Sequence, residues 1–220
     1  MNEILLMDNT HHMTEAKLLI APACPHCATM MSLLGELLKE GKISSLLMIN
    51  IAEQPEQAAI NNVRSVPWLK LGEIEFSGAH SRAELEHAID LAVSDNGQQQ
   101  LLFEQLKNGR LDEVAELVGR DRDLLSELVD LLKAKDVPMT VRIGVSAVLE
   151  GYQDSPDKLQ AIVPGLLELS ESSDETIRAD ACHFLSLAGG DEARKRLQEC
   201  TNDESSMVRE VAAEFFEPSQ

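Results

Sequence analysis

The periodicity of apolar residues changes partway along the chain, and this change separates two parts of different fold class. Residues 17–93 alternate short apolar runs with segments of helical periodicity, which is typical of strands alternating with helices. After a polar stretch at 95–100, suited to a linker, the sequence is helical in pattern and contains no convincing strand. We therefore predict an α/β domain over residues 1–95, with an arm at 1–16, and an all-α domain over 96–220.

Several local signals position the elements of the first domain. Residues 17–21 form an apolar run ending at Pro22, which predicts a buried strand, and a helical pattern follows over 25–39. A helix between two strands requires those strands to be parallel. The remaining predicted elements are a strand at 46–51, a helix at 55–62, a hairpin of strands 68–71 and 74–76 around Gly72-Glu73, and a helix that Ser81 and Glu84 cap with a capping box.

Charge and composition exclude several classes of partner. Lys and Arg total 19 against 38 Asp and Glu, giving a formal net charge of −19. Such a charge repels phosphate backbones and anionic lipids, so we expect no nucleic-acid and no membrane partner. No apolar run approaches the ~20 residues that span a bilayer. Four cysteines and an N-terminus without a signal-peptide pattern favour a reducing compartment, and we expect a cytoplasmic location.

The chemistry concentrates at Cys24-Pro25-His26-Cys27, between the first strand and the first helix. A C-x-x-C sequence can bind zinc, form a structural disulfide or exchange disulfides. If Cys24 is the N-cap and Pro25 the first helical residue, the helix dipole favours a Cys24 thiolate. Cys27 then lies one turn along, within reach of a mixed disulfide at Cys24. His26 either adds positive charge or is an exposed loop residue with no electrostatic role.

A zinc site is the main alternative to redox chemistry. A closed structural site needs four ligands, so the two cysteines would have to recruit two of His11, His12 and His80. The sequence contains no second C-x-x-C. We therefore predict no metal.

A second segment, Ser65-Val66-Pro67-Trp68, precedes the predicted hairpin. Together with the C-x-x-C sequence, the hairpin and residues 78–81, it forms a pattern that occurs in a known protein family. In these features the chain resembles the thioredoxin superfamily, in particular its smaller glutaredoxin-like members. The resemblance implies a thioredoxin-like fold and a cis Val66-Pro67 bond beside Cys24. It also implies that Cys24 and Cys27 are catalytic, that Pro25, His26, Val66 and Pro67 contact a protein thiol or disulfide substrate, and that no cofactor is needed.

The sequence also departs from that family. Thioredoxins proper have Trp-Cys-Gly-Pro-Cys, whereas Ala23 precedes Cys24 here and the Pro-His dipeptide is similar to that of the oxidising DsbA-type proteins. Leu18 stands six residues before Cys24, where thioredoxins bury a carboxylate. The departures predict a more oxidising pair and call fast reductase chemistry into question.

The helical domain contains a recurring sequence pattern in which an aliphatic residue precedes an arginine. The pairs begin at Val141, Ile177 and Val208, with spacings of 36 and 31 residues. This pattern is similar to HEAT-type repeats and predicts a stacked array, the alternative being a plain helical bundle. The first unit departs from the pattern because Gly144 and Gly151 occupy positions where helix formers are expected.

Sulfur-containing residues outside the C-x-x-C are most simply core residues. We predict that Cys182 and Cys200 are small core residues, with a second redox pair as the alternative that sequence separation cannot test. Met30, Met31 and Met48 are predicted to fill the first core instead of binding copper.

These observations predict a thiol-disulfide oxidoreductase that acts on protein disulfides, with the helical domain binding a substrate or partner protein. The alternative is a redox-sensing HEAT-like adaptor that binds its partner without turnover.

Overall fold

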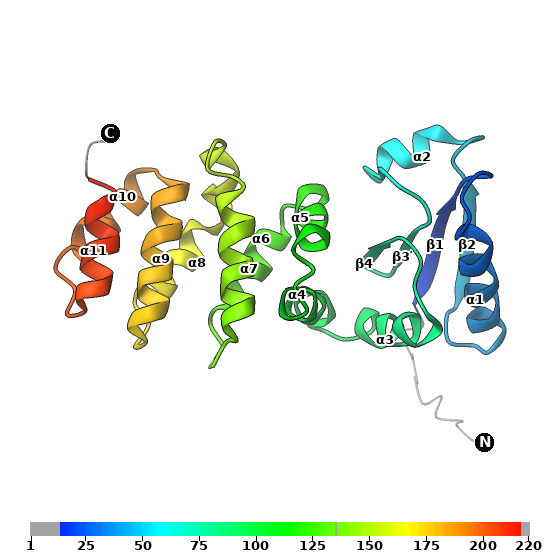
Figure 1. The fold of residues 1–220 in the computed structure, drawn as a ribbon, viewed down its shortest axis with the longest axis horizontal. Coiled ribbons are helices and arrows are strands. Elements are labelled where there is room, and N and C mark those ends of the chain that lie inside the picture. The colour runs from blue at the N-terminus through cyan, green and yellow to red at the C-terminus, as the bar shows by residue number, and fades with distance from the viewer. Residues whose placement is uncertain (1–13, 135, 217–220) are drawn as a thin grey trace, which may run out of the picture. The chain divides into compact units, whose positions relative to one another are not determined.

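The computed structural model describes residues 14–134 and 136–216. The chain divides into two compact units, residues 1–100 and 101–220, and each is described by itself. The N-terminal unit has a mixed sheet with helices and the C-terminal unit is helix-rich, so the predicted fold class is confirmed (Figure 1).

The sheet of the first unit has the strand order β2-β1-β3-β4. β1 pairs in parallel with β2, as the intervening helix requires, and antiparallel with β3, which forms a hairpin with β4. Gly72 in the hairpin turn has φ +56°, a conformation that glycine adopts without steric cost. The strands are β1 (Glu15–Ile20), β2 (Ser45–Asn50), β3 (Trp68–Leu71) and β4 (Ile74–Ser77).

Two helices cover one face of this sheet and form the main core of the unit. Leu18 and Leu69 from the sheet pack with Leu34 of α1 and Leu85 of α3, and all four side chains are buried. Ser81 accepts a hydrogen bond from the Glu84 N–H and completes the predicted capping box at the start of α3. The helices of this unit are α1 (Cys27–Lys39), α2 (Pro55–Ile60) and α3 (Arg82–Ala92).

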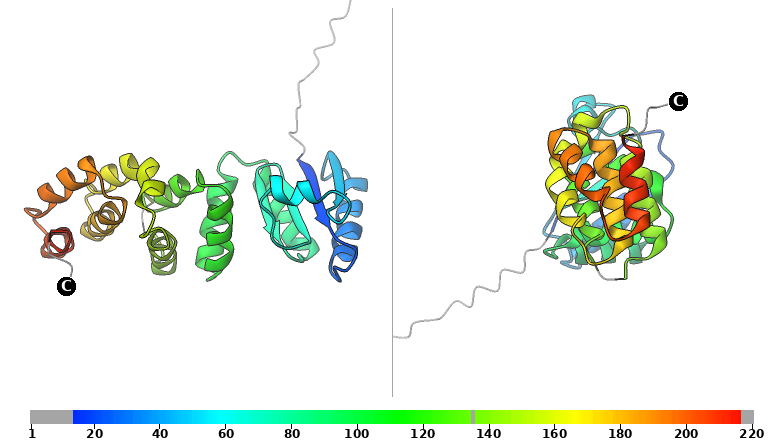
Figure 2. Two further views of the ribbon diagram at one scale, coloured as in Figure 1. Left: turned by 90° about the horizontal axis from the view of Figure 1, so that it is seen from above. Right: turned by 90° about the vertical axis from the view of Figure 1, so that its left-hand side faces the viewer.

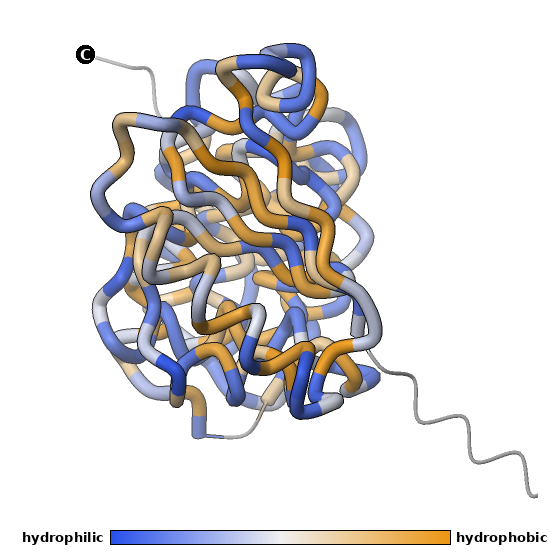
Figure 3. The backbone as a smooth tube through the Cα atoms, turned by 90° about the vertical axis from the view of Figure 1, so that its right-hand side faces the viewer, coloured by the Kyte–Doolittle hydropathy of each residue, from blue (hydrophilic) through white to orange (hydrophobic). Residues whose placement is uncertain are grey.

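The other face of the sheet carries a smaller cluster. Leu19, Ile49 and Trp68 are buried there, with Val63 and Val66 packed against them. Figure 3 shows hydrophobic residues recurring along the strands of this unit.

The methionines divide between the core and the surface. Met30 is fully buried and Met31 packs against the main core, as predicted. Met48 is 40% exposed, so its predicted core position is wrong. It lies on β2, an edge strand, and an edge strand is covered less completely than the strands inside a sheet.

The second unit consists of successive short helices in two rows, seen from above in Figure 2. α4 begins at Gly97, so the predicted linker at 95–100 is too long by one helical turn. Among the described residues no helix is long and apolar enough to cross a membrane. The helices are α4 (Gly97–Lys107), whose first turn belongs to the first unit, and then α5 (Leu111–Arg120), α6 (Leu124–Leu131), α7 (Met139–Glu150), the 3-10 helix η1 (Pro156–Ile162), α8 (Val163–Leu169), α9 (Glu175–Ala188), α10 (Asp191–Cys200) and α11 (Ser206–Glu214).

The recurring arginines occupy equivalent places in the first turns of α7, α9 and α11. The Nε of Arg142 donates a hydrogen bond to Asp180 on α9. In the same way, the Nε of Arg178 donates to Asp203, 3.0 Å away, in the loop before α11. Both guanidinium groups also donate to backbone carbonyls. Because α9 packs against α7 on one side and α11 on the other, these ion pairs join successive helices of one row.

Candidate functional site

The C-x-x-C segment forms a tight turn before α1. The helix begins at Cys27 and its N-cap is His26, so the interpretation with Cys24 as N-cap and Pro25 as first helical residue is wrong. The reason is local: the Cys27 N–H returns to the Cys24 carbonyl at 3.4 Å, and the first helical hydrogen bond runs from the Met30 N–H to His26. Two residues therefore separate Cys24 from the first helical residue, and Cys24 still lies near the positive end of the helix.

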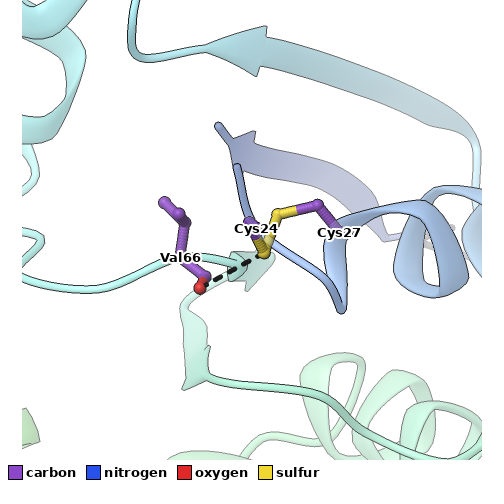
Figure 4. Close-up of a disulfide and its surroundings, with 3 residues drawn as sticks. All are labelled: Cys24, Cys27 and Val66. Atoms are coloured by element: carbon purple, nitrogen blue, oxygen red, sulfur yellow. Dashed lines mark hydrogen bonds between the residues drawn. A yellow bond between two sulfur atoms is a disulfide. The ribbon is translucent and has the colours of Figure 1, made fainter. Parts of the chain in front are cut away.

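Cys24 and Cys27 are joined as a disulfide, with Cα atoms 5.5 Å apart (Figure 4). Cys24 is half-buried, whereas Cys27 is only 4% exposed. A partner sulfur can thus reach Cys24 but not Cys27. This asymmetry is what an attacking and a resolving cysteine require.

The pairing of β1 with β3 brings the second predicted segment to the cysteines. Leu19 lies opposite Trp68, so the residues just before β3 face the turn that follows β1. The Val66-Pro67 peptide bond is cis, and the Val66 carbonyl oxygen lies 3.5 Å from the Cys24 sulfur. In the dithiol form the Cys24 S–H can donate to this oxygen (Figure 4).

The four residues predicted to contact substrate differ in exposure. Pro25 and His26 are exposed beside the disulfide, and Val66 is half-buried. Pro67 is buried, and its carbonyl accepts a hydrogen bond from the Gly78 N–H at 2.8 Å. Gly78 was not predicted as a site residue. The one sequence feature that pointed to it was its place in residues 78–81, which contribute to the family resemblance.

The chain segment that carries the disulfide contains few charged residues. Residues 18–35 contain no Asp, Glu, Lys or Arg, and the first turn of α1 has no acidic residue. Leu18 is fully buried in the core, so this strand position supplies no proton acceptor for Cys27. His26 is the one ionisable side chain besides the cysteines in residues 18–35.

The histidines proposed for a zinc site do not gather at the cysteines within the described residues. His80 belongs to another set of contacts: its N–H donates to the Met30 sulfur at 3.4 Å, its Nε2 lies 3.3 Å from the Ser77 carbonyl, and its ring contacts Phe76. No group of three or more His, Cys, Asp or Glu suited to a metal occurs in residues 14–134 and 136–216. His11 and His12 lie outside the residues that the structure describes.

The comparison with curated proteins gives no match. A family model described as a thioredoxin domain matches residues 14–90, which hold all the elements of the sheet, the disulfide and the cis peptide bond. The N-terminal unit of this protein is thus thioredoxin-like.

Proposed function

We propose that this protein is a thiol-disulfide oxidoreductase that acts on protein disulfides through Cys24 and Cys27. The main evidence is the disulfide between an accessible Cys24 and a buried Cys27. The Cys24 sulfur lies 3.5 Å from the Val66 carbonyl oxygen. The match to a thioredoxin domain supports the same chemistry.

In the reducing direction, the Cys24 thiolate attacks one sulfur of the substrate disulfide. The new Cys24–substrate bond forms as the substrate S–S bond breaks, and the leaving thiolate takes a proton. The Cys27 thiolate then attacks the Cys24 sulfur and releases the second substrate thiol. A thiol reductant such as glutathione supplies the two electrons that restore the dithiol, and the oxidising direction is the reverse.

In this proposal the substrate contacts the exposed residues next to the disulfide. Pro25 and His26 flank Cys24, and the main chain at Val66 is positioned to pair with an extended substrate segment. We assign Pro67 a positioning role, because it is buried and its carbonyl is already bonded to Gly78. The proposal retains a cytoplasmic location, since Cys182 and Cys200 are free thiols.

The equilibrium reduction potential against glutathione, followed by a turnover assay, tests this function. A cycling enzyme should have a potential of about −270 to −200 mV and should reduce many equivalents of a protein disulfide when glutathione and its reductase regenerate it. Exchange of a single equivalent per molecule, at any glutathione concentration, would rule out an enzyme.

One observation favours a second candidate, a redox-sensing adaptor without turnover. Residues 18–35, which hold most of β1, the C-x-x-C turn and the first turns of α1, contain no carboxylate. With no acceptor for the Cys27 proton in this segment, we expect a mixed disulfide to be resolved slowly. Single-equivalent exchange combined with a redox-dependent dissociation constant for a protein partner would establish the adaptor in place of the enzyme.

We further propose that the second unit is a HEAT-like repeat domain that binds the substrate or partner protein. The equivalent ion pairs of Arg142 and Arg178 support a repeat, since each joins its helix to the next unit. On α7, Met139 and Ile143 are 62% and 61% exposed, one turn apart. Adjacent exposed apolar side chains are typical of a protein-binding surface.

Replacing Ile143 by aspartate should separate the two roles. We expect kcat/KM for a folded protein disulfide to fall about tenfold, because a charge would be buried against the partner. The rate with a small disulfide such as oxidised glutathione should stay unchanged. A matched Glu210→Gln substitution, at an exposed position on α11, should alter neither rate. Equal losses with both substrates for Ile143→Asp would contradict a binding role of this surface.

A further inference from the structure

A single positively charged residue lies in the chain segments that form the candidate site. These segments are residues 18–35 with the disulfide, 57–69 with the cis peptide bond and 76–81 with Gly78. Charged residues make up 26% of the whole chain, but in these three segments Arg64 is the one Asp, Glu, Lys or Arg. The formal net charge of the chain is −19, so the sign of this residue is opposite to that of the whole. The disulfide chemistry proposed above gives Arg64 no role.

Apolar packing holds the backbone on both sides of Arg64. Val63 and Val66 pack against the buried cluster that contains Trp68. The Val63 N–H also donates a hydrogen bond to the Ala58 carbonyl at 2.8 Å. Arg64 lies between these two anchored residues and is exposed. The fold therefore holds its backbone in place while solvent reaches its side chain.

Arg64 is close enough to the disulfide to contact a substrate bound there. Two residues of chain span at most about 7 Å, so the Cα atom of Arg64 lies no farther than that from the Cα atom of Val66. The Val66 carbonyl oxygen in turn lies 3.5 Å from the Cys24 sulfur (Figure 4). A substrate segment that pairs with the main chain at Val66 therefore brings the residues next to its cysteine within reach of the Arg64 side chain.

The Arg64 guanidinium is available to bind a ligand. Within residues 14–134 and 136–216 it has no hydrogen-bond or ion-pair partner, whereas Arg82 pairs with Glu36 and Arg178 pairs with Asp203. A guanidinium binds a carboxylate through two parallel hydrogen bonds. The Debye length is about 8 Å at physiological ionic strength, so distant acidic residues act only weakly on a group that contacts Arg64.

We propose that Arg64 determines substrate specificity at the Cys24–Cys27 disulfide by pairing with a carboxylate beside the substrate disulfide. The preferred substrates are then protein disulfides with Asp or Glu within about two residues of the attacked cysteine. This inference rests on the proposed function for the reaction itself. It concerns the choice of partner at the same disulfide, and a redox-sensing adaptor would show the same preference.

Single-turnover exchange tests this specificity, because it measures recognition without requiring a complete catalytic cycle. The reduced full-length chain is mixed with the symmetric disulfide of a short peptide that carries Glu, Gln or Lys two residues before and after its cysteine. Release of the peptide thiol is followed over time. We expect the second-order rate constant to be about tenfold higher for the Glu peptide than for the Lys peptide, with the Gln peptide between them. Raising the salt concentration from about 0.05 M to about 0.5 M should reduce this ratio.

Charge substitutions at Arg64 assign the preference to this residue. Arg64→Gln should bring the Glu-to-Lys ratio of rate constants close to one, and Arg64→Glu should invert it. Lys39→Glu is the matched control, because Lys39 is exposed and ends α1, about 18 Å along the helix from Cys27. It should leave the ratio unchanged. The fluorescence of the buried Trp68 verifies that each variant is folded.

The outcomes separate this inference from the proposed function. An unchanged Glu-to-Lys ratio in Arg64→Glu, or an equal change in Lys39→Glu, would contradict the role of Arg64. The same holds if Arg64→Gln slows all three peptides by one common factor, because that result would mean an effect on the reactivity of Cys24. A charge preference in single exchange without repeated turnover in the glutathione assay would reject the enzyme and retain Arg64. Repeated turnover without a charge preference would reject Arg64 alone.

Discussion

Replacing Cys24 by serine should lower the rate of disulfide reduction by about three orders of magnitude or more, because a serine hydroxyl does not ionise near neutral pH and cannot attack a disulfide. Cys27→Ser should leave the attack intact and block resolution, so that the chain accumulates as a mixed disulfide with its substrate. The asymmetric burial of the two sulfurs is the basis of this difference. The measurement is turnover of a protein disulfide, together with non-reducing electrophoresis of the products.

A cysteine substitution elsewhere in the chain provides the control for these variants. Cys182→Ser removes a thiol from the second unit and should leave the rate of protein-disulfide reduction unchanged. Multiple turnovers by Cys27→Ser would mean that an external thiol resolves the mixed disulfide, and this would remove Cys27 from the mechanism. Full activity of Cys24→Ser would reject the site altogether.

The second large effect concerns the core behind the site. Leu18→Ala should lower the free energy of unfolding of the first unit by about 2–5 kcal/mol, since the side chain is fully buried and its loss leaves a cavity. Trp68 is the only tryptophan of the chain and is fully buried in the same unit. Its fluorescence during urea denaturation therefore reports the unfolding of the first unit.

Leu47→Ala is the matched control, because it makes the same truncation on the neighbouring strand at a side chain that is 56% exposed. We expect its free energy of unfolding to stay within about 0.5 kcal/mol of the unsubstituted chain. Equal losses for both substitutions would contradict the assignment of Leu18 to the core face and Leu47 to the exposed face.

Elements fixed by near neighbours in the chain were predicted well. The capping box of Ser81 and Glu84 needs only two residues three positions apart, and it forms as predicted. The parallel pairing of β1 and β2 follows from one intervening helix. The main local error concerns the start of α1, where Pro25 suggested a first helical residue while the Cys27 N–H instead closes a turn onto Cys24.

The candidate site itself was predicted only in part. The cysteine pair is visible as a motif, but the approach of the Val66 carbonyl to Cys24 was implied by family resemblance and not by the residues between them. The register that sets Leu19 opposite Trp68 produces this contact, and that register depends on the packing of the whole sheet. The exposure of Met48 likewise depends on its strand lying at the edge.

The sequence by itself determined the two fold classes, most of the elements and the C-x-x-C chemistry, because these depend on apolar periodicity and on residues a few positions apart. Only the tertiary structure decided that Cys24 is accessible while Cys27 is buried. Contacts between residues on different elements are set by which faces pack and in what register, and sequence separation does not encode that geometry.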